Sequence, residues 1–262
     1  MSQGAFLPLQ VRSYGALVGE AFRGLLRERI LYTFIFIAIF LILIGYLAAL
    51  LVWGRQDRVM LNFGAFVNAL AILGISIGTG SRILRSGIED RSIYLLLARP
   101  VHRGVFLLSR WSGLALFSLA YSLLLTVVLG VSVVIVGGAI KVAFFQGMAL
   151  IWIESLIASA LAILLSFFLR PGLAAMSSLA YLFLGHNHEQ ISFLIQKEAS
   201  SPGFLSLLRG VTPDLSLLLM DTRVVYDQPL ALSEFLLRAG YGFGWAFMFV
   251  LFGNAVFFRK NL

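Results

Sequence analysis

One carboxylate, Glu154, lies in the middle of residues 142–169, a long run with no other charge. A carboxylate at membrane depth costs roughly 2.5–3.5 kcal/mol on insertion scales, so such a residue by default marks a transport pathway, a proton relay or a partner. Two structural alternatives stay open. Because the run starts at Lys141, about 20 Å away along a helix, Glu154 could lie near the outer interface, or it could be protonated and hydrogen-bonded between helices.

Two histidines, His186 and His188, stand close together and are candidate metal ligands. A metal site needs converging ligands, and the spacing His-x-His at a helix end does not place both rings on one helical face. Only Glu189 and distant acids could complete a site, so we expect an exposed turn there and no bound metal. With no cysteine in the chain, thiolate metal sites and a Cys nucleophile are excluded.

Other catalytic and nucleotide-binding patterns do not stand out. We find no Ser/His/Asp triad, no paired carboxylates and no zinc spacing, which gives an enzymatic active site little support. Gly78-Thr79-Gly80 is not followed by Gly-Lys-Ser/Thr, so it is no phosphate-binding loop. We therefore expect this chain itself to bind no cofactor.

A charged island at residues 82–110 separates two uncharged runs. It contains six Arg against two acids, Glu89 and Asp90. Pro100 disfavours helix at the residue before it, so the island predicts a short helix within residues 86–100. Such a helix on an Arg-rich side indicates a contact for a cytoplasmic partner. The alternative is an ordinary loop whose Arg residues only fix membrane topology.

The composition is that of a polytopic membrane protein. Hydrophobic residues make up 60% of the chain and charged residues 12%, with a mean hydropathy of +0.95, whereas a soluble domain is about a quarter charged. We predict an all-α fold with six transmembrane helices in a single domain. The predicted spans are residues 30–54, 59–81, 108–138, 142–169, 171–186 and 239–258.

Two segments do not fit the spanning pattern. Residues 12–29 are amphipathic, which predicts a helix lying in the headgroup plane, with Arg23, Arg27 and Arg29 near lipid phosphates or a cytoplasmic partner; the alternative is the start of the first span. Residues 187–236 carry charges too often to span, so we predict an external segment of short interfacial or re-entrant helices.

Basic residues set the orientation. Thirteen Lys and Arg fall on the side of both termini and the charged island, and seven on the other side. This asymmetry predicts that both termini are cytoplasmic. The net charge of +8 is concentrated at span ends, which indicates contact with anionic headgroups and not with nucleic acid.

The layout and one local motif resemble the membrane subunit of an ABC-2-type transporter. The motif is GIEDRSIYLLLARPVHRGVFLLSRWSGL, residues 87–114. It is similar to the family pattern of an acidic residue, a hydroxyl residue, a leucine run and Pro-apolar-x-Arg before span three; Ser92 stands where threonine is usual. Glu154-Ser155-Leu156 and Gly185-His186 also resemble the branch named for copper-enzyme maturation permeases. The resemblance covers nearly the whole chain.

The resemblance implies a permease that works with a separate ATPase. Two permease chains, identical or paralogous, would pair, and two ATPase chains carrying ATP and Mg²⁺ would dock beneath them in a bacterial inner membrane. Residues 86–100 would be the coupling helix. The residues implied to contact the ATPase are Glu89, Asp90, Arg91, Tyr94, Pro100 and Arg103. Export is the family expectation, while the cargo and an external accessory protein stay open.

Two other classes of function stay open. In the first, the chain is a membrane-embedded enzyme that uses Glu154 and the two histidines. In the second, it is an anchoring subunit that recruits a cytoplasmic ATPase without moving a substrate. The enzyme class predicts that changing His186 or His188 abolishes activity, whereas the permease class predicts that changing Glu89 or Arg91 abolishes coupling.

Overall fold

A computed structural model describes residues 6–52, 54–83, 103–197 and 210–259. Within these ranges the chain is all-helical and forms no strand. Five helices are long and apolar enough to cross a membrane. They are α2 (Arg29–Leu50), α3 (Gln56–Gly80), α6 (Arg103–Ile135), α7 (Val142–Ser166) and α12 (Leu232–Arg259). The chain is therefore a helical membrane protein, in agreement with the composition.

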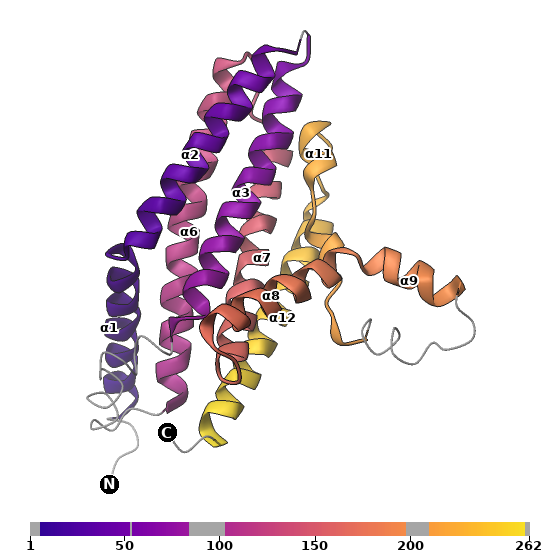
Figure 1. Cartoon of the computed structure of the whole chain (residues 1–262). Coiled ribbons are helices and arrows are strands. Elements are labelled where there is room, and N and C mark those ends of the chain that lie inside the picture. The colour runs from indigo at the N-terminus through magenta and orange to yellow at the C-terminus, as the bar shows by residue number, and fades with distance from the viewer. Residues whose placement is uncertain (1–5, 53, 84–102, 198–209, 260–262) are drawn as a thin grey trace.

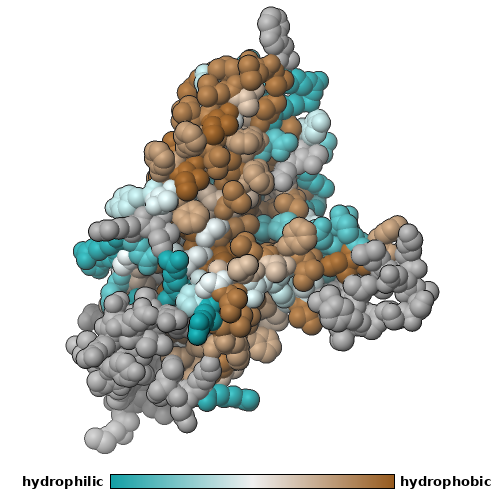
Figure 2. All heavy atoms as spheres, viewed as in Figure 1, coloured by the Kyte–Doolittle hydropathy of each residue, from teal (hydrophilic) through white to brown (hydrophobic). Residues whose placement is uncertain are grey.

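The five long helices run along one bundle axis (Figure 1). We call the end that contains α1 (Phe6–Leu26) and the C-terminal part of α12 the lower end, as drawn. The outer face of α2 is apolar and exposed, for example at Phe36, Phe40 and Leu47. Figure 2 shows the same character as a broad hydrophobic surface over the upper part of the bundle. Apolar surface of this extent suits contact with lipid.

The central helix is α7, which contacts α3, α6, α8 (Pro171–His186) and α12. It is hydrophobic all round, as a helix enclosed by other helices must be. Small residues bring its neighbours close. A Cβ on Gly80 of α3 would lie 3.0 Å from the carbonyl oxygen of Ser159 and 3.2 Å from the Cβ of Ala162. Close approach at glycine is typical of helix pairs in membranes.

Glycine also ends α6 and starts the turn to α7. Gly137 has a φ of +86°, a conformation that favours glycine. The Gly138 N–H donates to the carbonyl of Val133 at 2.9 Å, and the Gly137 N–H to that of Val134 at 3.0 Å. This is a Schellman motif. It fixes a sharp turn, so α6 and α7 are neighbours in the bundle.

Helix α8 begins at Pro171, a residue suited to the first position of a helix. It has 16 residues and is therefore about 24 Å long, too short to cross roughly 30 Å of hydrocarbon alone. Its buried residues are Ala174, Ser178, Leu182 and Gly185. The residues predicted as the fifth span thus form a helix packed on one face, and a count of six spans stays a prediction.

Helix α1, predicted to lie in the headgroup plane, packs against the bundle; its place relative to the membrane stays a prediction. Its apolar face, with Leu17, Val18 and Ala21 buried, packs along α6. At Gly113 of α6 an added Cβ would lie 2.6 Å from that of Ala21. The Tyr14 and Ser112 hydroxyls are 2.6 Å apart. The amphipathic pattern of residues 12–29 predicted one apolar face. That face is covered by protein, because α1 packs against the lower part of α6.

The segment before α12 partly returns to the bundle. Helix α9 (His188–Lys197) projects away from it, whereas the short helices η2 (Leu215–Leu218) and α11 (Asp221–Val225) lie against it (Figure 1). Leu215 and Leu218 are almost fully buried. In the described part of this segment, η2 contacts α7, α8 and α12, and α11 contacts α3 and α7. That the segment lies outside or dips into the membrane stays a prediction.

Candidate functional site

Most residues predicted to contact an ATPase fall outside the described residues: Glu89, Asp90, Arg91, Tyr94 and Pro100. Arg103 is the first residue of α6. The coupling helix therefore stays a prediction from the sequence. The candidate site described below is formed by other residues.

The three arginines of the predicted interfacial helix lie around the junction of α1 and α2. Arg23 is in the last turn of α1 and is exposed, Arg27 follows that helix and is exposed, and Arg29 is the first residue of α2. The exposed guanidinium groups of Arg23 and Arg27 suit contact with lipid phosphates. That contact stays a prediction.

Glu154 lies at the middle of the central helix α7, and its side chain is only 2% exposed. The helices around α7 enclose it. Next to it, Ile153 fills the place where Gly242 of α12 has no side chain, because a Cβ there would lie 2.4 Å from the Cγ2 of Ile153. Glu154 is thus held inside the bundle, and the alternative of a place at the outer interface does not fit α7.

His186, the last residue of α8, meets Glu154 across the helix–helix contact. The imidazole Nε2 lies 3.3 Å from the carboxylate Oε1, and the histidine side chain is 25% exposed. Beside His186, Gly185 lets residues 213–215 pack closely against the end of α8. A Cβ at Gly185 would lie 2.8 Å from the Leu215 side chain and 2.9 Å from the Pro213 carbonyl oxygen. The sequence presented Glu154 and His186 as separate candidates, and the fold makes them one pair.

The hydrogen bonds of His186 determine what this pair can hold. Its Nδ1 is 3.0 Å from the Leu182 carbonyl oxygen. A carbonyl can only accept, so Nδ1 carries a hydrogen and donates it. If Nε2 and the carboxylate were both unprotonated, two acceptors would face each other at 3.3 Å. One further proton, on Nε2 or on Oε1, would remove this repulsion and leave the pair with no net charge.

The imidazole of His186 is a group that could help to accommodate a carboxylate at this depth. An isolated ionised carboxylate in an apolar interior is very costly, whereas a proton shared with an imidazole removes the net charge. Carboxylates and imidazoles at membrane depth are the groups that proton relays use. The arrangement can hold a proton between α7 and α8, and it can release that proton only by leaving a net negative charge in the bundle.

His188 was the second of the two candidate metal ligands. Across the described ranges, no three His, Asp or Glu side chains come together in a way that could hold a metal ion. His186 and His188 stand on either side of Asn187, where α8 ends and α9 begins. The two imidazoles therefore belong to different helices.

Sequence reasoning missed a second buried polar contact near the centre. Asn68 of α3 is fully buried and its Nδ2 donates to the Sδ of Met148 on α7 at 2.7 Å. An amide in the apolar run 59–81 was the available signal, because polar side chains in spans commonly bond across helices. This contact joins α3 to α7, the helix that carries Glu154.

The chain was compared with models of known protein families and with curated proteins, and neither comparison found a match. The interpretation of the site therefore rests on its own geometry and on the sequence motif at residues 87–114.

Proposed function

We propose that this protein is the transmembrane permease subunit of an ATP-driven ABC-2-type transporter, acting with a separate ATPase. The observation that carries the transport part of this proposal is the Glu154–His186 pair, buried at the middle of the central helix. Ionisable groups placed there by default mark a pathway or a relay. The ATPase part rests on the sequence motif at residues 87–114.

A pure anchor would need only apolar helices that face lipid. It would gain nothing from a carboxylate enclosed between α7 and α8, which must be neutralised to be tolerated. A membrane enzyme would need a nucleophile or a substrate cavity at the pair, yet Glu154 is 2% exposed. The permease therefore accounts for more of the structure than either alternative does.

The fold also supplies a route for mechanical coupling. Helix α6 starts at Arg103, directly after the predicted coupling helix, and has 33 residues. It is about 50 Å long, roughly 20 Å more than the hydrocarbon thickness, so part of it can extend beyond the bilayer, and we expect that part to be its first turns. Helix α1 packs along this region, with Phe22 against Phe117. A displacement of residues 86–100 would therefore move a braced, rigid helix that contacts α3 and α7.

The test is co-purification of the detergent-solubilised chain from its native host, with the double variant Glu89→Ala/Arg91→Ala. We expect an ATPase to co-purify with the wild type and to be lost from the variant. A matched control is the double variant Asp57→Ala/Arg58→Ala. It also removes an acid and an arginine, but at the start of α3, whereas the predicted coupling helix follows the end of α3. If no ATPase is found with the wild type even after mild cross-linking, the permease proposal fails and the membrane enzyme becomes the better explanation.

A further inference from the structure

A polar pocket of about 340 Å³ lies at the upper end of the bundle, the end opposite α1 (Figure 1). Three parts of the chain form it: the start of α3, the turn between α6 and α7, and residues 224–227, where α11 ends. Its volume is within the range of roughly 300–1,000 Å³ that is usual for small-molecule sites. Two acidic and two basic side chains line the pocket: Asp57, Arg58, Lys141 and Asp227.

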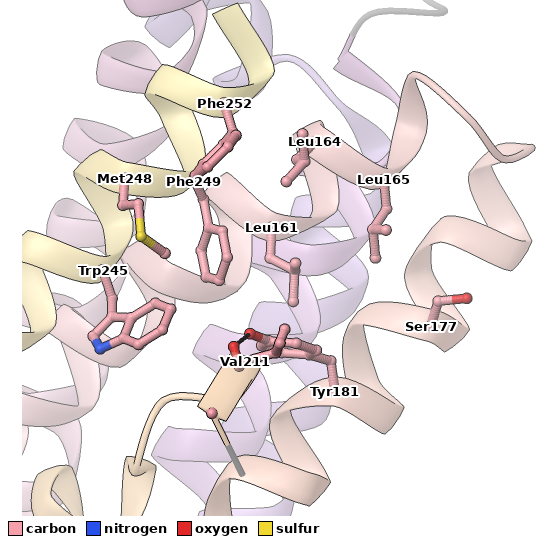
Figure 3. Close-up of a pocket in the computed structure, with 11 residues that line it drawn as sticks. Leu161, Leu164, Leu165, Ser177, Tyr181, Val211, Trp245, Met248, Phe249 and Phe252 are labelled. Atoms are coloured by element: carbon pink, nitrogen blue, oxygen red, sulfur yellow. Dashed lines mark hydrogen bonds between the residues drawn. The ribbon is translucent and has the colours of Figure 1, made fainter. Parts of the chain in front are cut away.

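A larger hollow between α7, α8 and α12 differs in kind (Figure 3). Leu161, Trp245 and Phe249 are typical of its lining, and none of the described residues that line it is charged. The Tyr181 hydroxyl donates to the Val211 carbonyl oxygen at 2.5 Å. The larger hollow therefore presents no charge that would distinguish one ligand from another, whereas the polar pocket presents four.

The walls of the polar pocket are joined to one another by specific contacts. A Cβ on Gly138 would lie 3.0 Å from the Cβ of Asp57, so the turn between α6 and α7 lies directly against the first turn of α3. The Lys141 amine donates to the Asp227 carboxylate at 2.7 Å, which joins the same turn to the residues after α11. Asp227 has a φ of +53°, a conformation that is uncommon for residues other than glycine.

Two of the four charges have no opposite charge beside them. Lys141 and Asp227 pair with each other, whereas neither Asp57 nor Arg58 forms an ion pair within the described part of the chain. The Arg58 guanidinium lies over the Tyr226 ring, 4.9 Å from its centroid. This contact holds the cation in place and leaves its N–H donors for a ligand. Both residues are half-buried, so an opposite charge on a ligand would be screened less than at an open surface.

Two helix N-termini add to the positive side of the pocket. Helices α3 and α7 both begin there, and neither N-cap residue, Arg55 or Lys141, makes a side-chain hydrogen bond to its helix. The first N–H groups of a helix have no partner inside it, and helix N-termini attract oxyanions. Together with Arg58, these ends suit a phosphate, and the Asp57 carboxylate lines the same pocket.

This mixture of charges selects a class of ligand. A simple anion would be attracted by Arg58 and the helix N-termini but repelled by Asp57, and a simple cation would meet the reverse. A ligand that carries both a phosphate and an ammonium can form charge-assisted hydrogen bonds with both residues. Guanidinium is well suited to phosphate, and a carboxylate accepts hydrogen bonds from a primary ammonium. The pocket therefore fits a zwitterion better than an ion of one sign.

The position of the pocket is at the ends of three candidate membrane spans, in α3, α6 and α7. Each of these helices has at least 25 residues and is therefore at least about 38 Å long. Because the hydrocarbon of a bilayer is only roughly 30 Å thick, we expect the helix ends to lie at the level of the phospholipid headgroups.

We propose that the polar pocket binds a phosphoethanolamine group, with its phosphate on Arg58 and its ammonium on Asp57. This group is the headgroup of phosphatidylethanolamine and also exists as free phosphoethanolamine, and the two sources are distinguished by experiment. The quaternary ammonium of choline has no N–H to donate to Asp57, and phosphatidylglycerol has no ammonium. The site does not depend on the proposed ATPase partner.

The test is native mass spectrometry of the purified, delipidated full-length chain, with each phospholipid added at the same series of concentrations. We expect phosphatidylethanolamine to bind roughly five- to tenfold more tightly than phosphatidylcholine or phosphatidylglycerol, because each of those lipids lacks the charge-assisted hydrogen bond to Asp57. A parallel titration with free phosphoethanolamine measures whether the headgroup alone binds and displaces the lipid.

Two variants test the two charges separately. Asp57→Asn keeps the shape of the side chain, so we expect it to abolish the preference for phosphatidylethanolamine and to strengthen binding of phosphatidylglycerol, since the repulsion is gone. Arg58→Gln should weaken binding of all three lipids, and it keeps the proposal testable if Asp57→Asn does not fold. Matched controls are Glu20→Gln and Arg170→Gln, an exposed acid and an exposed arginine outside the pocket, which should leave the preference unchanged.

Each result supports or overturns the proposal. Displacement of the lipid by free phosphoethanolamine would support it with a soluble ligand as the source, and binding of the lipid alone would support it with the membrane as the source. Equal binding of the three lipids by the wild type would overturn it, as would an Asp57→Asn variant that keeps the preference. The ATPase co-purification assay is separate, because Asp57→Ala/Arg58→Ala should keep the ATPase and lose the zwitterion.

Discussion

The pairing of Glu154 with His186 makes a quantitative prediction that a double-mutant cycle can test. The variants are Glu154→Gln, which keeps the shape of the carboxyl group, His186→Phe, which keeps a ring, and the double variant. His186→Phe also removes the hydrogen bond to Leu182. That loss occurs with and without Glu154, so it cancels in the cycle.

The magnitude follows from the geometry. Two unit charges 3.3 Å apart interact by about 5 kcal/mol at an effective dielectric constant near 20. The histidine keeps a quarter of its exposure, so solvent weakens the interaction. We expect His186→Phe alone to cost about 3 kcal/mol, because removing one partner of a buried pair leaves the other to be neutralised alone. The coupling energy should be roughly 1.5–3 kcal/mol.

The assay is equilibrium unfolding of the purified chain in mixed micelles with increasing SDS, at pH 7.5. We expect the double variant to be more stable than His186→Phe alone, because Gln needs no proton from the imidazole. Strictly additive effects, within about 0.5 kcal/mol, would refute the shared proton and return Glu154 to the status of a carboxyl that other helices satisfy.

Two further predictions concern packing and pH. Gly242→Ala should destabilise the fold by roughly 1–3 kcal/mol, because its Cβ would lie 2.4 Å from the Cγ2 of Ile153. Gly240→Ala and Gly244→Ala meet no atom within 4 Å and should be neutral or slightly stabilising, since alanine favours helix; equal losses at all three positions in the same unfolding assay would refute the α7–α12 contact. Burial raises the pKa of Glu28 above its ordinary value of 4.5, although the charge of Arg82 lowers it in part. A raised carboxyl pKa means that the folded chain binds the proton more strongly, so this group favours folding below its unfolded pKa and the contribution disappears as the pH rises through the folded pKa. Glu28→Gln should therefore be more stable than the wild type at pH 7.5, with a difference that shrinks toward pH 4; a difference that grows on acidification would contradict the burial of Glu28.

Hydropathy alone was sufficient to predict a helical membrane protein. A bilayer imposes about 20 apolar residues per helix and requires every backbone group to bond within the helix. These constraints act locally, so Gln56–Gly80, Val142–Ser166 and Leu232–Arg259 lie close to the predicted second, fourth and sixth spans. The turn at Gly137 and the start of a helix at Pro171 were likewise visible as residue types with restricted or special backbone preferences.

Partners could not be predicted in the same way. The amphipathic pattern of residues 12–29 shows that one face of α1 is apolar, but not whether lipid or α6 covers it. Short apolar pieces between residues 210 and 230 gave no sign that Leu215 and Leu218 would be buried against α7, α8 and α12. Coverage of a face depends on which other helix is near, and that is a property of the whole bundle.

The sequence by itself determined which groups are available for chemistry, Glu154 and His186, and that one of them lies deep in an apolar helix. Only the tertiary structure decided that they meet. The meeting depends on the length of α8 and on the turn at Arg170 and Pro171, which bring the last residue of α8 to the middle of α7. Each of these is a local feature, but the 3.3 Å contact results from their combined geometry, because helix packing fixes distances that no periodicity along the chain records.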